Sequence, residues 1–370
     1  MVISLWIIGI AFVALMVSRV IKFTNGSNVI EINQNNETEK IYKGLLLILI
    51  LWVVYSVVLG CRYGFVDTLT YRLMAQRIGD DFANVNDENL AIVEKGFNLW
   101  MVFCNRISNN NVQMFIFLTT TITFALAFIY IYKNSDDPVF SVYLFTALYL
   151  FTYINGIRQS FVTVIFALVF SKWKNKPVIL LIACIILSFF HNSALMLIPI
   201  CFCISGSFFN WKIKILYFFS LFCLVGYNQI QKLLDMIISE DYSETLNLMT
   251  TGTGIARVLV YSIPFALVML RAKYHNVEME DNDFNNIILI DMAINVCSLK
   301  STYFARLSIY FTIFIVTYFP KLIDKTFDKK YRTLAKVFFI LFYLAFFVYQ
   351  SYTFESYGYM KGLYLVPLWK

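Results

Sequence analysis

Charged side chains and the signatures of soluble enzymes are scarce in this sequence. Asp, Glu, Lys and Arg make up 14% of the 370 residues, and there are only two histidines. The sequence contains no phosphate-binding loop, no G-x-G-x-x-G motif and no H-E-x-x-H motif, and its seven cysteines form no C-x-x-C pair. The sequence therefore gives no sign of a nucleotide-binding site or a metal site, and we expect no cofactor.

Hydrophobic residues are in excess. They make up 59% of the chain, and the mean hydropathy is +0.68, which is more apolar surface than a soluble domain of this length could bury. We therefore predict an all-α polytopic membrane protein with about twelve transmembrane helices. The predicted spans are 2–18, 44–60, 112–132, 138–154, 158–171, 178–190, 194–205, 214–230, 256–270, 284–299, 302–319 and 334–350.

The placement of lysine and arginine predicts the orientation of the chain. If both termini lie outside, more than half of the 30 basic residues fall in inner loops, as the positive-inside rule requires. This explains the net charge of +7 without a nucleic-acid partner. We expect one integral membrane domain over residues 1–370, with a large outer loop at 61–111 and a second outer loop at 229–255.

The segment 153–195 is the first candidate for a functional site. Arg158 and His191 are predicted at the same end of two neighbouring apolar helices, and a charge at the rim of a membrane helix suggests a function. The planar fork of Arg158 suits a pyrophosphate, although backbone carbonyls could also bind it. A lone histidine is more often a satisfied polar residue than a catalyst, so its position opposite Arg158 is what makes His191 a candidate base.

The predicted outer loop supplies further candidates, each with a structural alternative. Arg62 follows a span at headgroup level, where it could bind a phosphate or simply snorkel. Asp67 and Tyr71 are four residues apart and would share a helix face, but Asp67 could also be a helix N-cap. Glu94 is a candidate base or sugar-binding carboxylate, or else a solvated helix residue beside Lys95.

Two charges lie within neighbouring spans near the end of the chain. The spans that carry Asp291 and Arg306 are joined by a short turn, so the helices would be antiparallel and the two charges would lie at similar depth. One interpretation is a buried ion pair that holds the helical hairpin together. The other is that Arg306 takes part in anion binding.

Five short motifs follow one another along the chain. They are Arg62…Asp67-x-x-x-Tyr71, Glu94-x-Gly96-Phe97, Asn155-x-x-Arg158-Gln159, Phe190-His191-x-Ser193-Ala194-Leu195 and Arg306-x-x-x-Tyr310-Phe311. In this order they resemble the motifs of the EpsG-like branch of the Wzy-type polysaccharide polymerases. The resemblance extends from the second predicted span to the eleventh.

The resemblance implies a GT-C-like glycosyltransferase of the bacterial inner membrane. Such an enzyme polymerises the repeat units of an O-antigen of lipopolysaccharide, a capsule or an exopolysaccharide at the periplasmic or outer face. The growing glycan leaves its undecaprenyl-pyrophosphate carrier and is joined to a sugar hydroxyl of the next lipid-linked unit. The implied partners are these two lipid-linked oligosaccharides and membrane lipid, and a chain-length regulator and a flippase are left open as further partners.

This chemistry divides the candidate residues into two groups. A pyrophosphate leaving group requires cations on its oxygens, and the acceptor hydroxyl requires a carboxylate or an imidazole nearby. His191 is the first choice of base because an imidazole can accept a proton at neutral pH, and Asp67 and Glu94 remain alternatives. The residues expected to bind substrate or pyrophosphate are Arg158, Arg306, Arg62, Gln159, Tyr71 and Tyr310.

Two other kinds of function fit part of the same pattern. A lipid-linked oligosaccharide flippase or another transporter suits twelve spans, but the sequence has no internal repeat, and its charges gather at one rim rather than along a central path. An O-antigen ligase or a membrane acyltransferase would also use a histidine and arginines at a membrane face.

Overall fold

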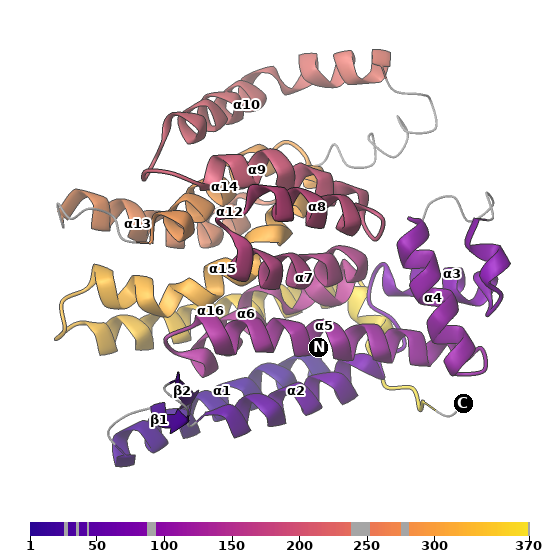
Figure 1. Ribbon diagram of the computed structural model, residues 1–370, viewed down its shortest axis with the longest axis horizontal. Coiled ribbons are helices and arrows are strands. Elements are labelled where there is room, and N and C mark those ends of the chain that lie inside the picture. Colours follow the sequence, from indigo (N-terminus) through magenta and orange to yellow (C-terminus); the bar gives the residue numbers. More distant parts are fainter. Residues whose placement is uncertain are drawn as a thin grey trace.

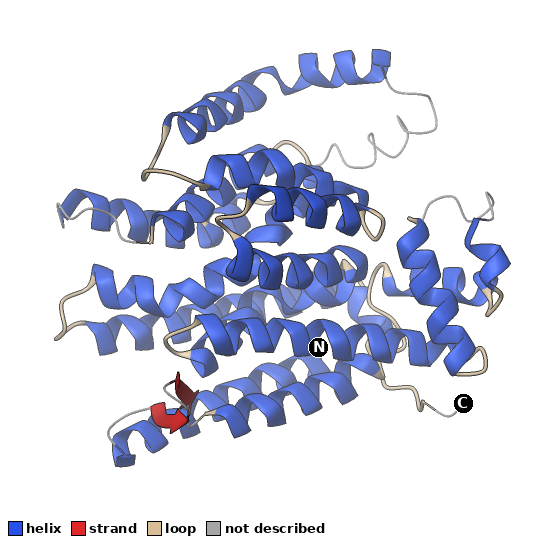
Figure 2. Ribbon diagram, in the orientation of Figure 1, coloured by secondary structure: helices blue, strands red, loops and turns tan. Residues whose placement is uncertain are grey.

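A computed structural model describes residues 1–25, 29–34, 37–42, 44–86, 94–237, 252–274 and 281–368 of the chain. Helices form nearly all of this part (Figure 2), so the predicted all-α architecture is confirmed. One short antiparallel hairpin, β1 (Val29–Gln34) and β2 (Glu37–Tyr42), interrupts the helices after the first of them. Of the second predicted outer loop, residues 238–251 lie outside the described residues.

Helices cover every predicted apolar segment, and additional helices occupy the predicted outer loop at 61–111. The elements of the first half are α1 (Val2–Asn25), α2 (Leu45–Gly60), α3 (Thr68–Ile78), η1 (Phe82–Asn86), α4 (Lys95–Ile107), α5 (Val112–Asn134), α6 (Pro138–Asn155) and α7 (Ile157–Trp173). Those of the second half are α8 (Pro177–Ser188), η3 (Asn192–Met196), α9 (Leu197–Ile204), α10 (Trp211–Ile237), α12 (Ile255–Tyr261), α13 (Ile263–Tyr274), α14 (Asn282–Ser298), α15 (Thr302–Thr326), α16 (Arg332–Ser356) and η4 (Tyr359–Gly362).

Several helices are able to cross a membrane. By length and composition, five of the described helices qualify, namely α1, α5, α6, α15 and α16, and the bent pair α12 and α13 would make a sixth. Helix α8 has 12 residues, which is about 18 Å of helix against a hydrocarbon core of about 30 Å. The five or six long apolar helices make the chain a multi-pass membrane protein. The number of twelve spans, which would include short helices such as α8, remains a prediction.

The core of the bundle lies along α6 and α15, the two most buried of the long helices. Figure 1 shows the long helices running side by side between two ends of the molecule. Aromatic side chains fill the spaces between them. For example, the buried Tyr55 ring packs edge-to-face with the rings of Phe124 and Phe128, and both centroid-to-centroid distances are 5.5 Å. Because α6 and α15 are covered on nearly all sides, residues at their ends are held in fixed positions.

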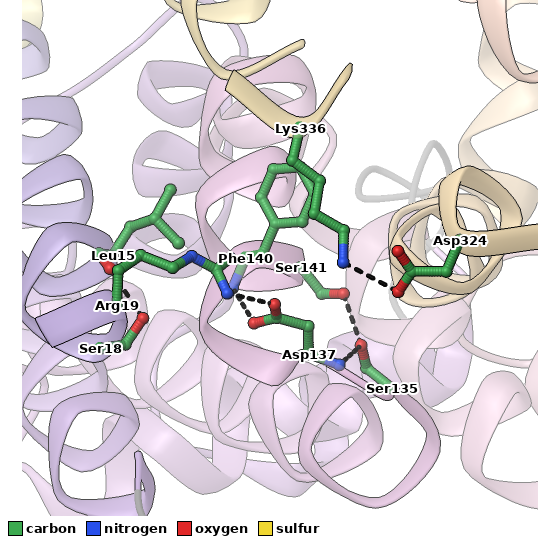
Figure 3. A network of polar contacts seen from close by, with 9 residues as sticks. All are labelled: Leu15, Ser18, Arg19, Ser135, Asp137, Phe140, Ser141, Asp324 and Lys336. Carbon is green, nitrogen blue, oxygen red and sulfur yellow. Dashed lines mark hydrogen bonds and ion pairs between the residues drawn. The ribbon is translucent and has the colours of Figure 1, made fainter. Parts of the chain in front are cut away.

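One end of the bundle is fastened by ion pairs (Figure 3). The Arg19 guanidinium lies 2.5 Å from the Asp137 carboxylate, which also accepts a hydrogen bond from the backbone N–H of Phe140 and so caps α6. Nearby, Lys336 of α16 pairs with Asp324 of α15 at 2.8 Å. These contacts join helices at the end where the lysine-rich loops were predicted, and they leave the opposite end to the candidate site.

The opposite end carries α3, α4 and the C-terminal segment (Figure 1). The backbone N–H of Tyr63 donates to the Tyr364 carbonyl, and that of Gly64 donates to the Gly362 carbonyl, both at 2.8 Å. A Cβ atom at Gly362 would lie only 2.8 Å from the Gly64 carbonyl oxygen, so this close pairing depends on glycine. The tail thereby holds the loop after α2 in place.

Candidate functional site

A cavity of about 390 Å³ opens at the end of the bundle that carries α3 and α4. It lies between the start of α3, the junction of α6 and α7, the tip of the α8–η3 turn, the start of α12, the start of α15 and the end of α16. Six of the nine residues predicted for the site line it: Asp67, Tyr71, Arg158, Gln159, His191 and Arg306. Segments far apart in the sequence therefore meet at one cavity, as the motif analysis expected.

Short connections place the charged side chains at the ends of helices. Gly156 alone separates α6 from α7, so Arg158 falls in the first turn of α7. Ser301 caps α15 by accepting a hydrogen bond from the backbone N–H of Tyr303, which places Arg306 in the second turn. The N-terminal ends of both helices thus face the cavity, and their dipoles favour negative charge there.

The Glu94 carboxylate connects three parts of the site. One of its oxygens pairs with the Arg158 guanidinium, whose Nε donates to the Tyr71 hydroxyl at 3.2 Å. The other accepts a hydrogen bond from the backbone N–H of Asn192 at 2.9 Å and lies 3.3 Å from His191 Nδ1. The His191 contact is an ion-pair distance without the angles of a hydrogen bond. Glu94 is largely buried, so it is not a solvated helix residue.

The groups around Glu94 keep its carboxyl ionised. Burial alone would raise the pKa of this carboxyl, but its contact with His191, the charge of Arg158 and the N–H of Asn192 outweigh burial and lower it to about 2. A carboxylate with so low a pKa is a weak base at neutral pH. The ionised carboxylate lies against both Arg158 and His191, and these contacts hold the two side chains in position.

Gly96 explains how α4 comes close enough for this contact. Its backbone N–H donates to the Phe189 carbonyl at 2.8 Å, and a Cβ atom at position 96 would lie 2.8 Å from the same oxygen. The turn after α8 therefore rests directly on the first turn of α4. This approach brings Glu94, two residues before Gly96, to the backbone of Asn192.

Arg306 and Asp67 are the most accessible charged pair of the cavity. Their side chains are 53% and 39% exposed, and the closest oxygen–nitrogen distance between them is 4.0 Å. Asp67 occupies the N-cap position of α3, but its side chain makes no capping hydrogen bond. The residue is held in place by its backbone N–H, which donates to Asn155 Oδ1 at 3.0 Å. The carboxylate of Asp67 therefore faces the cavity, and Arg306 is open to an anion.

Gln159 and Tyr310 support the site from behind. The Gln159 amide donates to the Arg306 backbone carbonyl at 2.6 Å and so joins the starts of α7 and α15. The buried Tyr310 hydroxyl shares a hydrogen bond of 2.9 Å with Ser193 and fixes the segment that follows His191. Tyr310 does not line the cavity, so the structure gives it a positioning role rather than the substrate contact that we predicted.

Arg62 also differs from its prediction. It is 1% exposed, and its guanidinium donates to the carbonyls of Leu59 and Ile154 and to the Thr120 hydroxyl at 2.5–3.0 Å. Leu59 and Ile154 lie in the last turns of α2 and α6, where carbonyls lack partners within their own helices. Arg62 therefore joins two helix ends inside the protein. Because its guanidinium is enclosed, it can neither bind a phosphate at the surface nor extend to the membrane interface.

The predicted ion pair between Asp291 and Arg306 is not formed. Asp291 is buried and accepts hydrogen bonds from the Ser308 hydroxyl at 2.5 Å and from the Asn295 amide at 3.0 Å. Ser308 lies two residues after Arg306, and side chains with this spacing point to different sides of a helix. Since Ser308 faces α14, Arg306 faces the cavity, which favours the second interpretation of this arginine.

Arg257 is a cavity residue that the sequence analysis missed. It lies in the first turn of α12, half-buried, with its guanidinium 5.1 Å from the centre of the Tyr261 ring. The argument that singled out Arg158, a charge at the rim of an apolar segment, applies equally to Arg257. Three arginines of the described chain thus line the cavity and make it attractive to anions. The described residues include no group of three or more His, Cys, Asp or Glu side chains able to hold a metal.

Comparison with known proteins gives one match. A family model described as the EpsG family matches residues 45–364, which is most of the chain and includes every motif and every residue of the cavity. No curated protein and no solved structure matches significantly.

Proposed function

Since the chain belongs to the EpsG family, whose members are polysaccharide polymerase-like membrane proteins, we propose that it is a glycosyltransferase that joins lipid-linked oligosaccharide repeat units. The donor is a glycan on undecaprenyl pyrophosphate, the acceptor is the next lipid-linked unit, and the cavity faces the outer side of the bacterial cytoplasmic membrane. The single observation that carries this proposal is that Arg158, His191 and Arg306, with Asp67 beside them, line one cavity.

The arginines provide what a diphosphate leaving group requires. Negative charge grows on the pyrophosphate oxygens as the bond to the sugar breaks, and guanidinium groups already in place stabilise that charge. Arg306 is half-exposed toward the cavity, and Arg158 is held rigidly by Glu94 and Tyr71. The two act together as the anion site.

His191 is the base that we favour. The carboxylate of Glu94 beside Nδ1 stabilises a proton on that nitrogen, which leaves Nε2 to accept one from the acceptor hydroxyl. Asp67 is the alternative base, because its carboxylate is accessible and lies beside Arg306. Glu94 is the least favoured of the three candidates, because it is paired with Arg158 and is not among the residues that line the cavity.

The bonds of the proposed step balance without a further reagent. The acceptor hydroxyl gives its proton to His191, and its oxygen forms a bond to the anomeric carbon of the donor glycan. The bond from that carbon to the pyrophosphate oxygen breaks, and its electron pair leaves with undecaprenyl pyrophosphate. The product remains on the acceptor's carrier lipid and is longer by one repeat unit.

The direct test uses purified protein and lipid-linked repeat units, with products separated on a gel. Wild-type protein should give a ladder. Arg306→Ala should reduce the initial rate by about 10²–10³-fold and His191→Gln by about 10²–10⁴-fold. Arg106→Ala, a change of an exposed arginine in α4 away from the cavity, is the matched control. Wild-type ladders from both cavity variants would refute the anion site and the base.

The material that accumulates in a deletion strain distinguishes the competing functions. Loss of a polymerase leaves single repeat units attached to the outer lipid acceptor. Loss of a flippase leaves units on the carrier inside, and loss of a ligase leaves finished polymer on the carrier. Either of the last two outcomes would replace the function proposed here.

A further inference from the structure

A second cavity of about 330 Å³ lies beside the first. The two share four lining residues, Phe151, Thr152, Arg257 and Phe354, so they are separated only by the side chains of a common wall. The second cavity lies between the end of α6, the start of α12 and the last turns of α16. A ligand in the second cavity would therefore lie next to the first, with Arg257 in contact with both cavities.

The chemistry of the two cavities differs. The first is lined by three arginines, a histidine and a carboxylate, whereas among the described residues Arg257 is the one charged side chain that lines the second. Apart from Gly254 and Ala256, the rest of the second lining is aromatic or carries neutral hydrogen-bonding groups, such as Tyr349, Gln350 and Thr353. Amide and hydroxyl groups match sugar hydroxyls, and aromatic rings match the apolar faces of sugars. The second cavity therefore suits a neutral saccharide better than a diphosphate.

The aromatic wall is built and accessible. The ring of Tyr349 stacks on that of Phe346, with 6.4 Å between the ring centroids. The rings of Phe346 and Tyr261 pack edge-to-face, with 6.2 Å between their centroids. Tyr261 in turn donates to the Leu148 carbonyl, so the wall is anchored on α6. Tyr349 is 56% exposed, which leaves most of its ring free to contact a ligand.

We propose that this second cavity binds the saccharide of the acceptor. The inference rests on the proposed function, since joining two lipid-linked units requires room for two saccharides beside one reaction centre. The acceptor saccharide lies on the aromatic wall of α16, and Arg257 guides its terminal hydroxyl toward His191. The donor diphosphate occupies the first cavity.

The test separates acceptor binding from donor binding. Fluorescently labelled repeat-unit oligosaccharide, freed from its carrier lipid, can accept a glycan but cannot donate one, because it has no leaving group. Full-length protein in lipid nanodiscs receives lipid-linked units as donor and this free saccharide as acceptor, and the KM of each is measured. Direct binding of the labelled saccharide is measured on the same samples.

Two tyrosines of α16 form a matched pair for this experiment. Tyr349 lines the second cavity, whereas Tyr352, at 68% exposure on the same helix, does not. Tyr349→Ala should raise the acceptor KM about tenfold, equivalent to about 1.4 kcal/mol, with the donor KM unchanged. Tyr349→Phe keeps the ring and should recover most of that loss. Tyr352→Ala should match the wild type.

The outcomes distinguish this inference from the proposed function. If wild-type protein builds a ladder from lipid-linked units but neither binds nor extends the free saccharide, the acceptor site is refuted and the polymerase stands. An unchanged acceptor KM in Tyr349→Ala, or equal changes in Tyr349→Ala and Tyr352→Ala, would also refute it. Wild-type protein that makes no ladder would remove both proposals.

Discussion

Replacing Glu94 by glutamine removes one charge and changes the shape of the site very little. Arg158 would then lie largely buried beside a neutral amide, and His191 would no longer have a carboxylate next to its Nδ1 atom. The pKa of Glu94 is about 2 rather than 4.5, a difference that corresponds to about 3 kcal/mol in favour of the charged form in the folded protein. Breaking a buried ion pair costs about 3–5 kcal/mol, and the residual exposure of both side chains lowers that cost. We expect Glu94→Gln to lose about 2–3 kcal/mol of unfolding free energy.

Reversible unfolding in mixed micelles measures this loss. Glu355→Gln makes the same chemical change at an exposed pair with the N-terminal amine, where both groups are about half-exposed. The cost of such a surface pair is within about 1 kcal/mol, so this variant is the matched control. Equal stability of Glu94→Gln and wild-type protein would show that the carboxylate is not paired in the folded molecule.

The pH dependence gives a second check on Glu94. Its folded-state pKa is lowered, so its stabilising contribution is complete above about pH 4.5 and is lost as the pH falls toward 2. The difference in unfolding free energy between wild-type protein and Glu94→Gln should therefore shrink over this interval and stay constant above it. A difference that does not change between pH 5 and pH 3 would contradict the assigned pairing.

Three further predictions test the surroundings of the site. Gly96→Ala forces a contact with the Phe189 carbonyl, so it should lower the free energy of unfolding by about 1–3 kcal/mol and also lower the polymerisation rate. Gly9→Ala is the control and should be neutral, because no atom lies within 4 Å of its added Cβ. Equal stability of the two variants would refute the close approach of α4 to the turn after α8. In Arg62→Lys the ammonium cannot reach all the acceptors of the guanidinium, so the free energy of unfolding should fall by about 1–3 kcal/mol. A fall in polymerisation without a fall in stability would restore a substrate role to Arg62. A cysteine at Asn192 should react with an impermeant maleimide added outside intact cells, and labelling only after permeabilisation would reverse the orientation.

The sequence alone determined the class of the protein and the region of its site. An apolar fraction of 59% in long unbroken runs leaves a helical membrane protein as the solution, because every backbone polar group must be satisfied within the bilayer. The same runs show which charges lie at helix ends, which identified Arg158 and His191, and which lie within a span, which identified Arg306. These are local properties of the chain, and a sequence states them directly.

Only the tertiary structure decided what each charge touches. Glu94 and Arg158 are 64 residues apart in the sequence, and their contact depends on the approach of α4 to the turn after α8. Arg62 and Arg257 both stand at the ends of apolar segments, yet helix-end carbonyls enclose the first, while the second faces a cavity. Hydropathy cannot separate these two cases, because a guanidinium is satisfied equally by carbonyls or by an anion, and the packing of distant helices determines which of them it meets.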